Sequence, residues 1–191
     1  DLEIEGNLDD AMRLNLELRV GFHVQLELDR FTCPDADTLY GAVNALAWEE
    51  LLPLESYFSV VSRVSNSTIT NSMFPSLKVK DAVVDRISAQ LGARPDSGPM
   101  RDRIVLTLLW LGNDAVMYLD TSGEKLSDRG YRRVMSKAPM RETLAAALVK
   151  ATGYDGSVPF VNPMCGSGTL AIEAALIATN RAPGLLRSNF S

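Results

Sequence analysis

The stretch from Asn162 to Thr169, with glycines at positions 166 and 168, constrains the fold of this chain more than any other. It follows the short apolar segment 158–162 and precedes an apolar helical pattern over 170–179. A glycine-rich turn at the carboxyl end of a parallel strand lets a ligand approach the backbone without Cβ clashes. The helix that follows offers free N–H groups and a positive dipole end to a carboxylate or phosphate. This order predicts a buried strand, a ligand-binding loop and a helix of an α/β domain.

Four interpretations of this turn compete. A P-loop is disfavoured because no Gly-Lys-Ser/Thr closes the motif. Residues 166–171 meet the loose dinucleotide fingerprint Gly-x-Gly-x-x-Ala, but no acidic residue stands about twenty positions further on to bind a ribose. A catalytic thiol at Cys165 fits a helix N-terminus, which lowers a thiol pKa, but the single histidine, His23, lies on the polar face of a predicted strand. The fourth interpretation is an ordinary tight turn.

Elsewhere the spacing of apolar residues predicts further helices and strands. Val79, Val83, Ile87 and Leu91 recur every fourth residue, which is typical of an amphipathic helix packed on a core. Two apolar segments flank Gly112-Asn113-Asp114, a strong signal for a β-hairpin. We predict helices over 8–18, 35–51, 76–91, 139–150 and 170–179, and strands over 20–28, 57–64, 103–111, 115–120 and 158–162.

Individual residues refine these elements. Asp35 or Asp37 is expected to cap the second helix, and Pro139 suits the first position of the fourth. Trp48 and Trp110 lie in apolar contexts, so we expect both in the core.

The composition is that of a globular protein, with 46% hydrophobic and 23% charged residues among 191. The net charge of −5 conceals a split. Residues 1–60 carry 3 basic and 13 acidic side chains, whereas residues 61–150 carry 14 basic and 9 acidic ones. Such asymmetry suggests a polyanion partner for the basic part, although an unevenly charged, solvated surface gives the same pattern. There is no membrane-span candidate and no metal-ligand spacing, and the two cysteines, 132 positions apart, predict a reducing, cytoplasmic location.

The segment Asn-Pro-Met-Cys-Gly-Ser-Gly-Thr from Asn162, followed by Ile-Glu-Ala-Ala, resembles motif I of the S-adenosylmethionine-dependent methyltransferases. Within these it resembles the bacterial THUMP-domain ribosomal RNA guanine-N2 methyltransferases. Other segments are similar to this family, in the same order along the chain. Residues 65–67 and 77–86 resemble its THUMP signature, and residues 119–124 and 129–132 resemble the junction between its THUMP and catalytic domains. Residues 138–148 resemble the helix before motif I, and residues 182–185 resemble the stretch after the motif I helix.

The resemblance implies an α+β architecture in four parts. These are a partial ferredoxin-like segment over 1–34, a THUMP RNA-binding domain over 35–120, a linker over 121–137, and the truncated start of a Rossmann-like α/β methyltransferase domain over 138–191. We therefore expect a piece of a longer protein. The family's catalytic Asn-Pro-Pro-aromatic loop lies downstream of motif I and does not occur here, so no catalytic residue is nominated.

The resemblance also implies S-adenosylmethionine as the cofactor. The family usually has Asp where this chain has Asn162, and Cys165 becomes a small loop residue instead of a nucleophile. The cofactor residues that it implies are Asn162, Pro163, Cys165, Gly166, Ser167, Gly168 and Thr169, with Pro139 and Thr143 from the flanking helix.

Large-subunit ribosomal RNA is the implied partner, with the methyl group passing to the exocyclic N2 of a guanine taken out of its stack. Three alternatives stay open: a relative of the adenine-N6 methylases, a module that only binds RNA, and a fragment of an NAD-dependent oxidoreductase. The basic side chains expected to contact phosphates are Lys78, Lys80 and Arg86 on the THUMP-like helix, and Arg129, Arg132, Arg133 and Lys137 in the junction.

Overall fold

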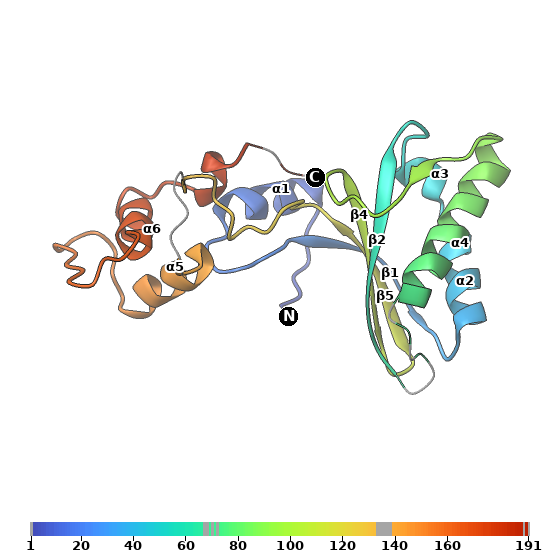
Figure 1. The fold of residues 1–191 in the computed structure, drawn as a ribbon, viewed down its shortest axis with the longest axis horizontal. Helices are drawn as coiled ribbons and strands as arrows, with labels where there is room; N and C mark the ends of the chain where they lie inside the picture. Colours follow the sequence, from blue (N-terminus) through green and yellow to red (C-terminus); the bar gives the residue numbers. More distant parts are fainter. Residues whose placement is uncertain are drawn as a thin grey trace. The chain divides into compact units, whose positions relative to one another are not determined.

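The computed structural model describes residues 2–66, 69, 71, 73–132, 139–188 and 190. Their packing divides them into two units, whose elements are drawn in Figure 1. The sheet unit comprises residues 25–123, and the helical unit comprises residues 2–24 with 124–190. The predicted boundary at 34/35 differs from this division, because residues 25–32 form a strand of the sheet.

In the described part of the chain, the sheet unit is built on β1 (Gln25–Thr32), β2 (Tyr57–Ser65), β3 (Asp96–Ser97), β4 (Ile104–Leu111) and β5 (Asp114–Asp120). Their order is β1-β5-β4-β2-β3. Strand β5 runs antiparallel to β1 and β4, whereas β2 runs parallel to β3 and β4. The predicted hairpin is confirmed, since Leu111 pairs with Asp114 across a two-residue turn that begins at Gly112. Gly112 has a φ of +59°, which favours glycine.

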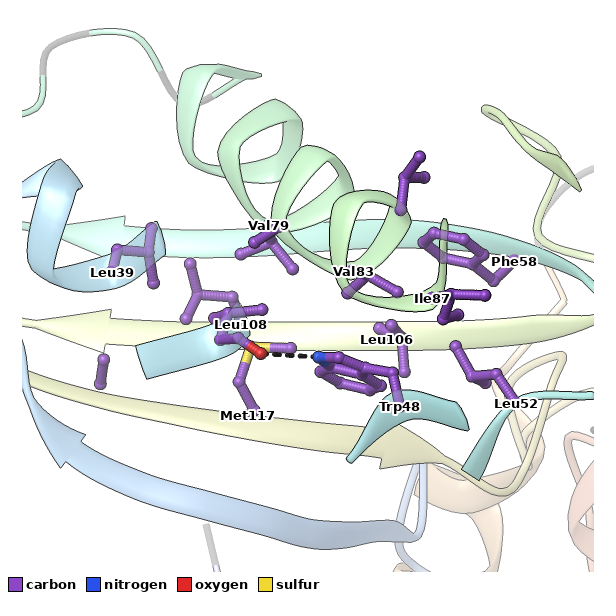
Figure 2. Close-up of a cluster of buried hydrophobic side chains, with 14 of the residues drawn as sticks. Leu39, Trp48, Leu52, Phe58, Val79, Val83, Ile87, Leu106, Leu108 and Met117 are labelled. Atoms are coloured by element: carbon purple, nitrogen blue, oxygen red, sulfur yellow. Dashed lines mark hydrogen bonds between the residues drawn. The ribbon is translucent and has the colours of Figure 1, made fainter. Parts of the chain in front are cut away.

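Three helices cover one face of this sheet (Figure 1): α2 (Ala36–Ala45), α3 (Trp48–Leu51) and α4 (Met73–Leu91). Helix α4 presents Val79, Val83 and Ile87 to the sheet, in one buried cluster with Leu106 and Leu108 of β4 (Figure 2). The amphipathic spacing therefore predicted α4 and its buried face as far as Ile87, whereas Leu91, the last residue of the predicted stripe, is 46% exposed.

Both tryptophans lie in this core, as predicted. The Trp48 indole N–H donates to the Val43 carbonyl at 2.6 Å, and the Trp110 indole N–H donates to the Cys33 carbonyl at 2.8 Å. All four residues are fully buried. Each bond satisfies an indole N–H that has been removed from water.

The helix predicted over 35–51 is interrupted. Asp35 caps its start as predicted, accepting from two backbone amides, but α2 ends at Ala45 and Trp48 begins a separate short helix. The interruption brings the Trp48 indole back onto the Val43 carbonyl, a contact that a continuous helix would not make.

The strand predicted over 20–28 lies further along the chain than expected. Strand β1 starts at Gln25, paired with Asp120, and ends at Thr32, paired with Asp114. A strand exists only where a neighbour supplies hydrogen bonds, so the length of β5 sets the limits of β1. The alternation of apolar residues before Gln25 has no such partner strand in the described residues.

The helical unit contains α1 (Leu8–Glu17), α5 (Glu142–Ala151), α6 (Thr169–Ala178) and the short 3-10 helix η1 (Pro183–Leu186). Helix α5 packs on α6, and η1 packs on α1. The helices predicted over 8–18 and 170–179 are confirmed. Among the residues that the structure describes, every helix is too short or too polar to span a bilayer.

Helix α5 begins at Glu142 instead of Pro139. The backbone at Arg141 is extended, so Pro139 lies three residues before the first helical position. This extended approach leaves the Met140 carbonyl outside the helix, where it accepts a hydrogen bond from Arg132 at 3.1 Å.

Another expectation for the helical unit is wrong. Residues 158–162 form no buried strand, and Val158 and Val161 are 60% and 80% exposed. The described residues of this unit contain no strand that could pair with them. Within the predicted linker 121–137, the described residues include the buried Ser122, Leu126 and Arg129. Residues 133–138 lie outside the described residues.

Candidate functional site

The loop before α6 contains two glycines in the left-handed region. The φ angle is +51° at Gly166 and +79° at Gly168, which is the N-cap of α6. An L side chain in this region costs about 1–2 kcal/mol, which accounts for glycine at both positions. A Cβ atom added at either glycine would meet no described atom within 4 Å. The space beside the loop is therefore open to a ligand.

Helix α6 begins with amide groups that no described side chain caps. Its first backbone bond runs from the Ile172 amide to the Gly168 carbonyl, at 2.9 Å. The amides of residues 169–171 consequently have no acceptor within the helix. Together with the positive end of the helix dipole, they suit a carboxylate or a phosphate.

Two of the predicted site residues hold buried polar atoms without a hydrogen-bond partner among the described residues: Thr143 Oγ1 and Asn162 Nδ2. Thr143 is 2% exposed in the first turn of α5, and Asn162 begins the loop. A buried polar atom left unpaired costs about 1–3 kcal/mol, which a bound polar ligand would relieve. The amide of Asn162 can donate a hydrogen bond, which a carboxylate at this position cannot.

The other predicted cofactor residues differ in exposure. Pro163, Cys165 and Ser167 are exposed on the loop, and Cys165 is a free thiol. Thr169 is buried at the first position of α6, and Pro139 is half-buried ahead of α5. Among the described residues, no group of three or more His, Cys, Asp and Glu side chains could hold a metal ion.

Arg132, which was expected to contact RNA, lies between this loop and α5. Its side chain is only 15% exposed. The guanidinium donates to Glu142 Oε1 at 2.9 and 3.2 Å, to the Met140 carbonyl at 3.1 Å, to Thr169 Oγ1 at 3.3 Å and to Ser167 Oγ at 3.4 Å. These partners lie 8 to 37 positions away in sequence, so no local pattern could have indicated the network.

The expectation that Arg129 contacts RNA is wrong, because its side chain is 1% exposed. The guanidinium nitrogens donate to three main-chain carbonyls, and Nε lies 3.6 Å from Oε1 of the buried Glu173. Burial lowers the pKa of Arg129, and the negative charge of Glu173 opposes that shift. The three carbonyls belong to Leu18, Arg19 and Leu126.

Tyr131 completes this buried cluster by donating its hydroxyl to Glu173 Oε1 at 3.1 Å. Burial raises the pKa of Glu173, partly offset by the charge of Arg129 and the bond from Tyr131, and burial also raises the pKa of Tyr131. Glu173 is the one charged residue in the helix TLAIEAALIA. A single carboxylate in an otherwise apolar helix indicates a buried partner, and this signal was available in the sequence.

The basic residues of α4 lie near carboxylates of α2, of α3 and of α4 itself. Lys78 lies 3.4 Å from Asp37, and Lys80 lies 3.3 Å from Asp81. Arg86 makes two hydrogen bonds to Glu49, at 2.6 and 3.0 Å. This pairing raises the pKa of Arg86 and lowers that of Glu49. The two remaining residues expected to bind RNA, Arg133 and Lys137, lie outside the described part of the chain.

Comparison with known proteins matches the chain to two domain families. Residues 33–120 match the THUMP domain family, and residues 129–191 match the RMKL-like methyltransferase domain family. The chain is 39% identical over 189 residues to the ribosomal RNA large subunit methyltransferase K/L of Psychromonas ingrahamii. It is 41% identical over 190 residues to the protein of the same name from Magnetococcus marinus. These alignments cover 99% and 97% of this chain, but only 25% and 26% of the length of the two relatives.

Two solved structures are similar to nearly the whole chain. A protein described as an N6-adenine-specific DNA methylase from Listeria monocytogenes strain 4b F2365 superposes with a TM-score of 0.87 and 38% identity, over 97% of this chain and 48% of that one. SMU.472, described as a methyltransferase and solved with SAH, gives a TM-score of 0.84 and 32% identity, over 97% of this chain and 49% of that one. The chain is thus similar to the THUMP domain family over residues 33–120 and to the RMKL-like methyltransferase domain family over residues 129–191.

Proposed function

We propose that the protein containing this chain transfers the methyl group of S-adenosylmethionine to N2 of a guanine in large-subunit ribosomal RNA. The observation that carries the proposal is the open loop at Gly166 and Gly168, directly ahead of the uncapped α6, in a chain that also carries a THUMP domain. The names of the relatives support the RNA substrate, and the structure solved with SAH supports the cofactor. The choice of guanine N2 rests on the resemblance of the motifs.

The residues present fit S-adenosylmethionine. The free amides of 169–171 suit the carboxylate of its methionine part, and the unpaired atoms of Thr143 and Asn162 supply further hydrogen bonds. When bound, the sulfonium supplies an electrophilic methyl group. The residues of this chain hold and orient the cofactor, and such orientation converts a bimolecular step into an effectively unimolecular one.

The sheet unit supplies the candidate RNA surface on α4. Lys78 and Lys80 are paired with Asp37 and Asp81, which are 96% and 56% exposed. Ion pairs this exposed are weak and exchange readily for a phosphate. Arg86 is held by two bonds to a carboxylate that is only 19% exposed, so it is less available. We therefore rank the two lysines above Arg86 as phosphate contacts.

In vitro methylation of ribosomal RNA by the full-length protein tests the reaction. After digestion of the product, mass spectrometry identifies the modified nucleoside, and we expect N2-methylguanosine. The structure described as an N6-adenine-specific DNA methylase favours N6-methyladenosine as the second candidate. Detection of N6-methyladenosine alone would replace the proposed specificity. Calorimetric binding of NAD without binding of S-adenosylmethionine would refute the proposed class of reaction.

Salt dependence of RNA binding tests the α4 surface. The variant K78Q/K80Q should flatten the slope of log K against log salt by roughly 1.4–1.8, because each phosphate contact contributes about 0.7–0.9. The control R13Q/K150Q removes two exposed positive charges from α1 and α5 and should leave the slope unchanged. Equal slopes for K78Q/K80Q and the wild type would exclude this surface.

A further inference from the structure

The guanidinium of Arg132 connects the starts of the two helices that flank the glycine-rich loop. On one side it is held by Glu142, the first residue of α5. On the other side it reaches the hydroxyls of Thr169, the first residue of α6, and of Ser167 in the loop. Glu142 and Thr169 are both buried, whereas the space beside Gly166 and Gly168 is open.

The same segment also holds α6 one turn further along. The Tyr131 hydroxyl donates to Glu173, and the buried Arg129 lies against the same carboxylate oxygen. Glu173 and Thr169 are four residues apart and share a face of α6. Within four consecutive residues, three side chains therefore contact the first turns of the helix that begins at the loop.

Arg132 holds two hydroxyls beside the start of α6. Ser167 Oγ and Thr169 Oγ1 lie 3.0 Å from each other, and both are within 3.4 Å of the guanidinium. Neither hydroxyl belongs to Gly168, the N-cap residue, from which a side chain would accept hydrogen bonds from the first amides. Arg132 therefore fixes two hydroxyls on either side of a cap that has no side chain, next to amides that stay available to a ligand.

We propose that Arg132 is a positioning residue for the cofactor, acting through Ser167 and Thr169 with Glu142 as its anchor, and that it has no direct role in RNA binding. This proposal rests on the proposed function, because it assumes that the loop binds S-adenosylmethionine. It assigns to cofactor binding a basic residue whose position in the junction suggested a phosphate contact.

Calorimetry of S-adenosylhomocysteine binding to the full-length protein tests this role. R132Q should weaken the affinity about tenfold or more, and R132K should lose less because it keeps one charged donor. RNA affinity should stay unchanged in both variants. The control R13Q removes an exposed arginine that also pairs with a glutamate, and it should change neither affinity. In the double variant R132Q/T169V the losses should not add, because both substitutions break the same bond.

Two readouts separate this proposal from the proposed function and from a folding defect. Without any ligand, hydrogen exchange of a peptide covering 165–175 should accelerate in R132Q and not in R13Q, at a melting temperature within a few degrees of the wild type. Unchanged exchange with wild-type S-adenosylhomocysteine affinity would overturn the positioning role, as would a loss of RNA affinity alone. Failure of the wild type to bind S-adenosylhomocysteine would refute the proposed function, while hydrogen exchange would still decide whether Arg132 orders the loop.

Discussion

Replacing either tryptophan by phenylalanine isolates the contribution of one buried carbonyl. Both indoles are fully buried in the core of the sheet unit, so W48F and W110F remove the same atoms from similar surroundings. They differ in what happens to the acceptor. The Val43 carbonyl, which accepts from the Trp48 indole, also accepts from the Leu46 amide at 3.3 Å. The Cys33 carbonyl accepts from Trp110 at a fully buried position.

The magnitudes follow from these contacts. Loss of ring volume costs roughly 1–2 kcal/mol in either variant, a fraction of the 3–5 kcal/mol measured for complete truncation of an aromatic residue. A lost hydrogen bond whose acceptor keeps another donor costs about 1 kcal/mol, whereas a buried acceptor left unpaired costs about 1–3 kcal/mol. We therefore expect W110F to lower the free energy of unfolding by about 1 kcal/mol more than W48F.

Urea unfolding of the 191-residue chain, followed by tryptophan fluorescence, measures this difference. The chain has two tryptophans, both in the sheet unit, so each variant keeps one indole that reports on the unfolding of that unit. With a slope of about 1–3 kcal/mol per molar urea, the midpoints should differ by roughly 0.3–1 M. A W48F variant as destabilised as W110F, or more so, would refute the reasoning about the acceptors.

Three further predictions concern single side chains. Gly41 lies exposed inside α2, and an added Cβ would meet no described atom within 4 Å, so G41A should raise the free energy of unfolding by about 0.5–1 kcal/mol in the same urea assay. A thiol reagent should titrate the exposed Cys165 in the native chain and reach Cys33 only after unfolding, because burial raises the pKa of Cys33 to about 11; two native thiols would contradict this. Arg86 lowers the pKa of Glu49. Their pairing therefore stabilises the fold at pH values above about 4.3, the pKa of a glutamate in an unfolded chain, and this stabilisation is lost as the pH falls through the lower pKa of the folded state. The melting-temperature advantage of the wild type over E49Q should accordingly shrink between pH 7 and pH 3, and a constant difference would refute it.

Elements with a strong local signal were predicted well. A four-residue repeat of apolar side chains predicts helix α4 and its buried face, and the turn residues from Gly112 predict the hairpin of β4 and β5. The glycines of the loop before α6 were also recognisable, because a positive φ selects glycine at Gly166 and Gly168. Such signals act within one helical turn or one tight turn, so they are present in the sequence itself.

Elements that depend on a distant partner were not predicted. The limits of β1 are set by β5, and residues 158–162 lack a described partner strand in their unit. The role of Arg129 depends on Glu173, which is 44 positions away and buried with it. From the sequence alone, a basic residue in a basic stretch is predicted to contact phosphate. Only the tertiary structure shows that a buried carboxylate faces it.

The sequence by itself determined helices α1, α4 and α6, the hairpin, the glycine-rich loop and the family resemblance, because each is encoded by residues close together in the chain. Only the tertiary structure decided which charges remain available to a partner. Lys78 and Lys80 keep exposed counterions, whereas Arg129 and Arg132 are withdrawn into contacts with α5 and α6. The physical reason is that a charged side chain can bind a partner only if it is in contact with water. A charge that is buried against a carboxylate or a carbonyl is not available, and such burial arises only when distant segments pack together.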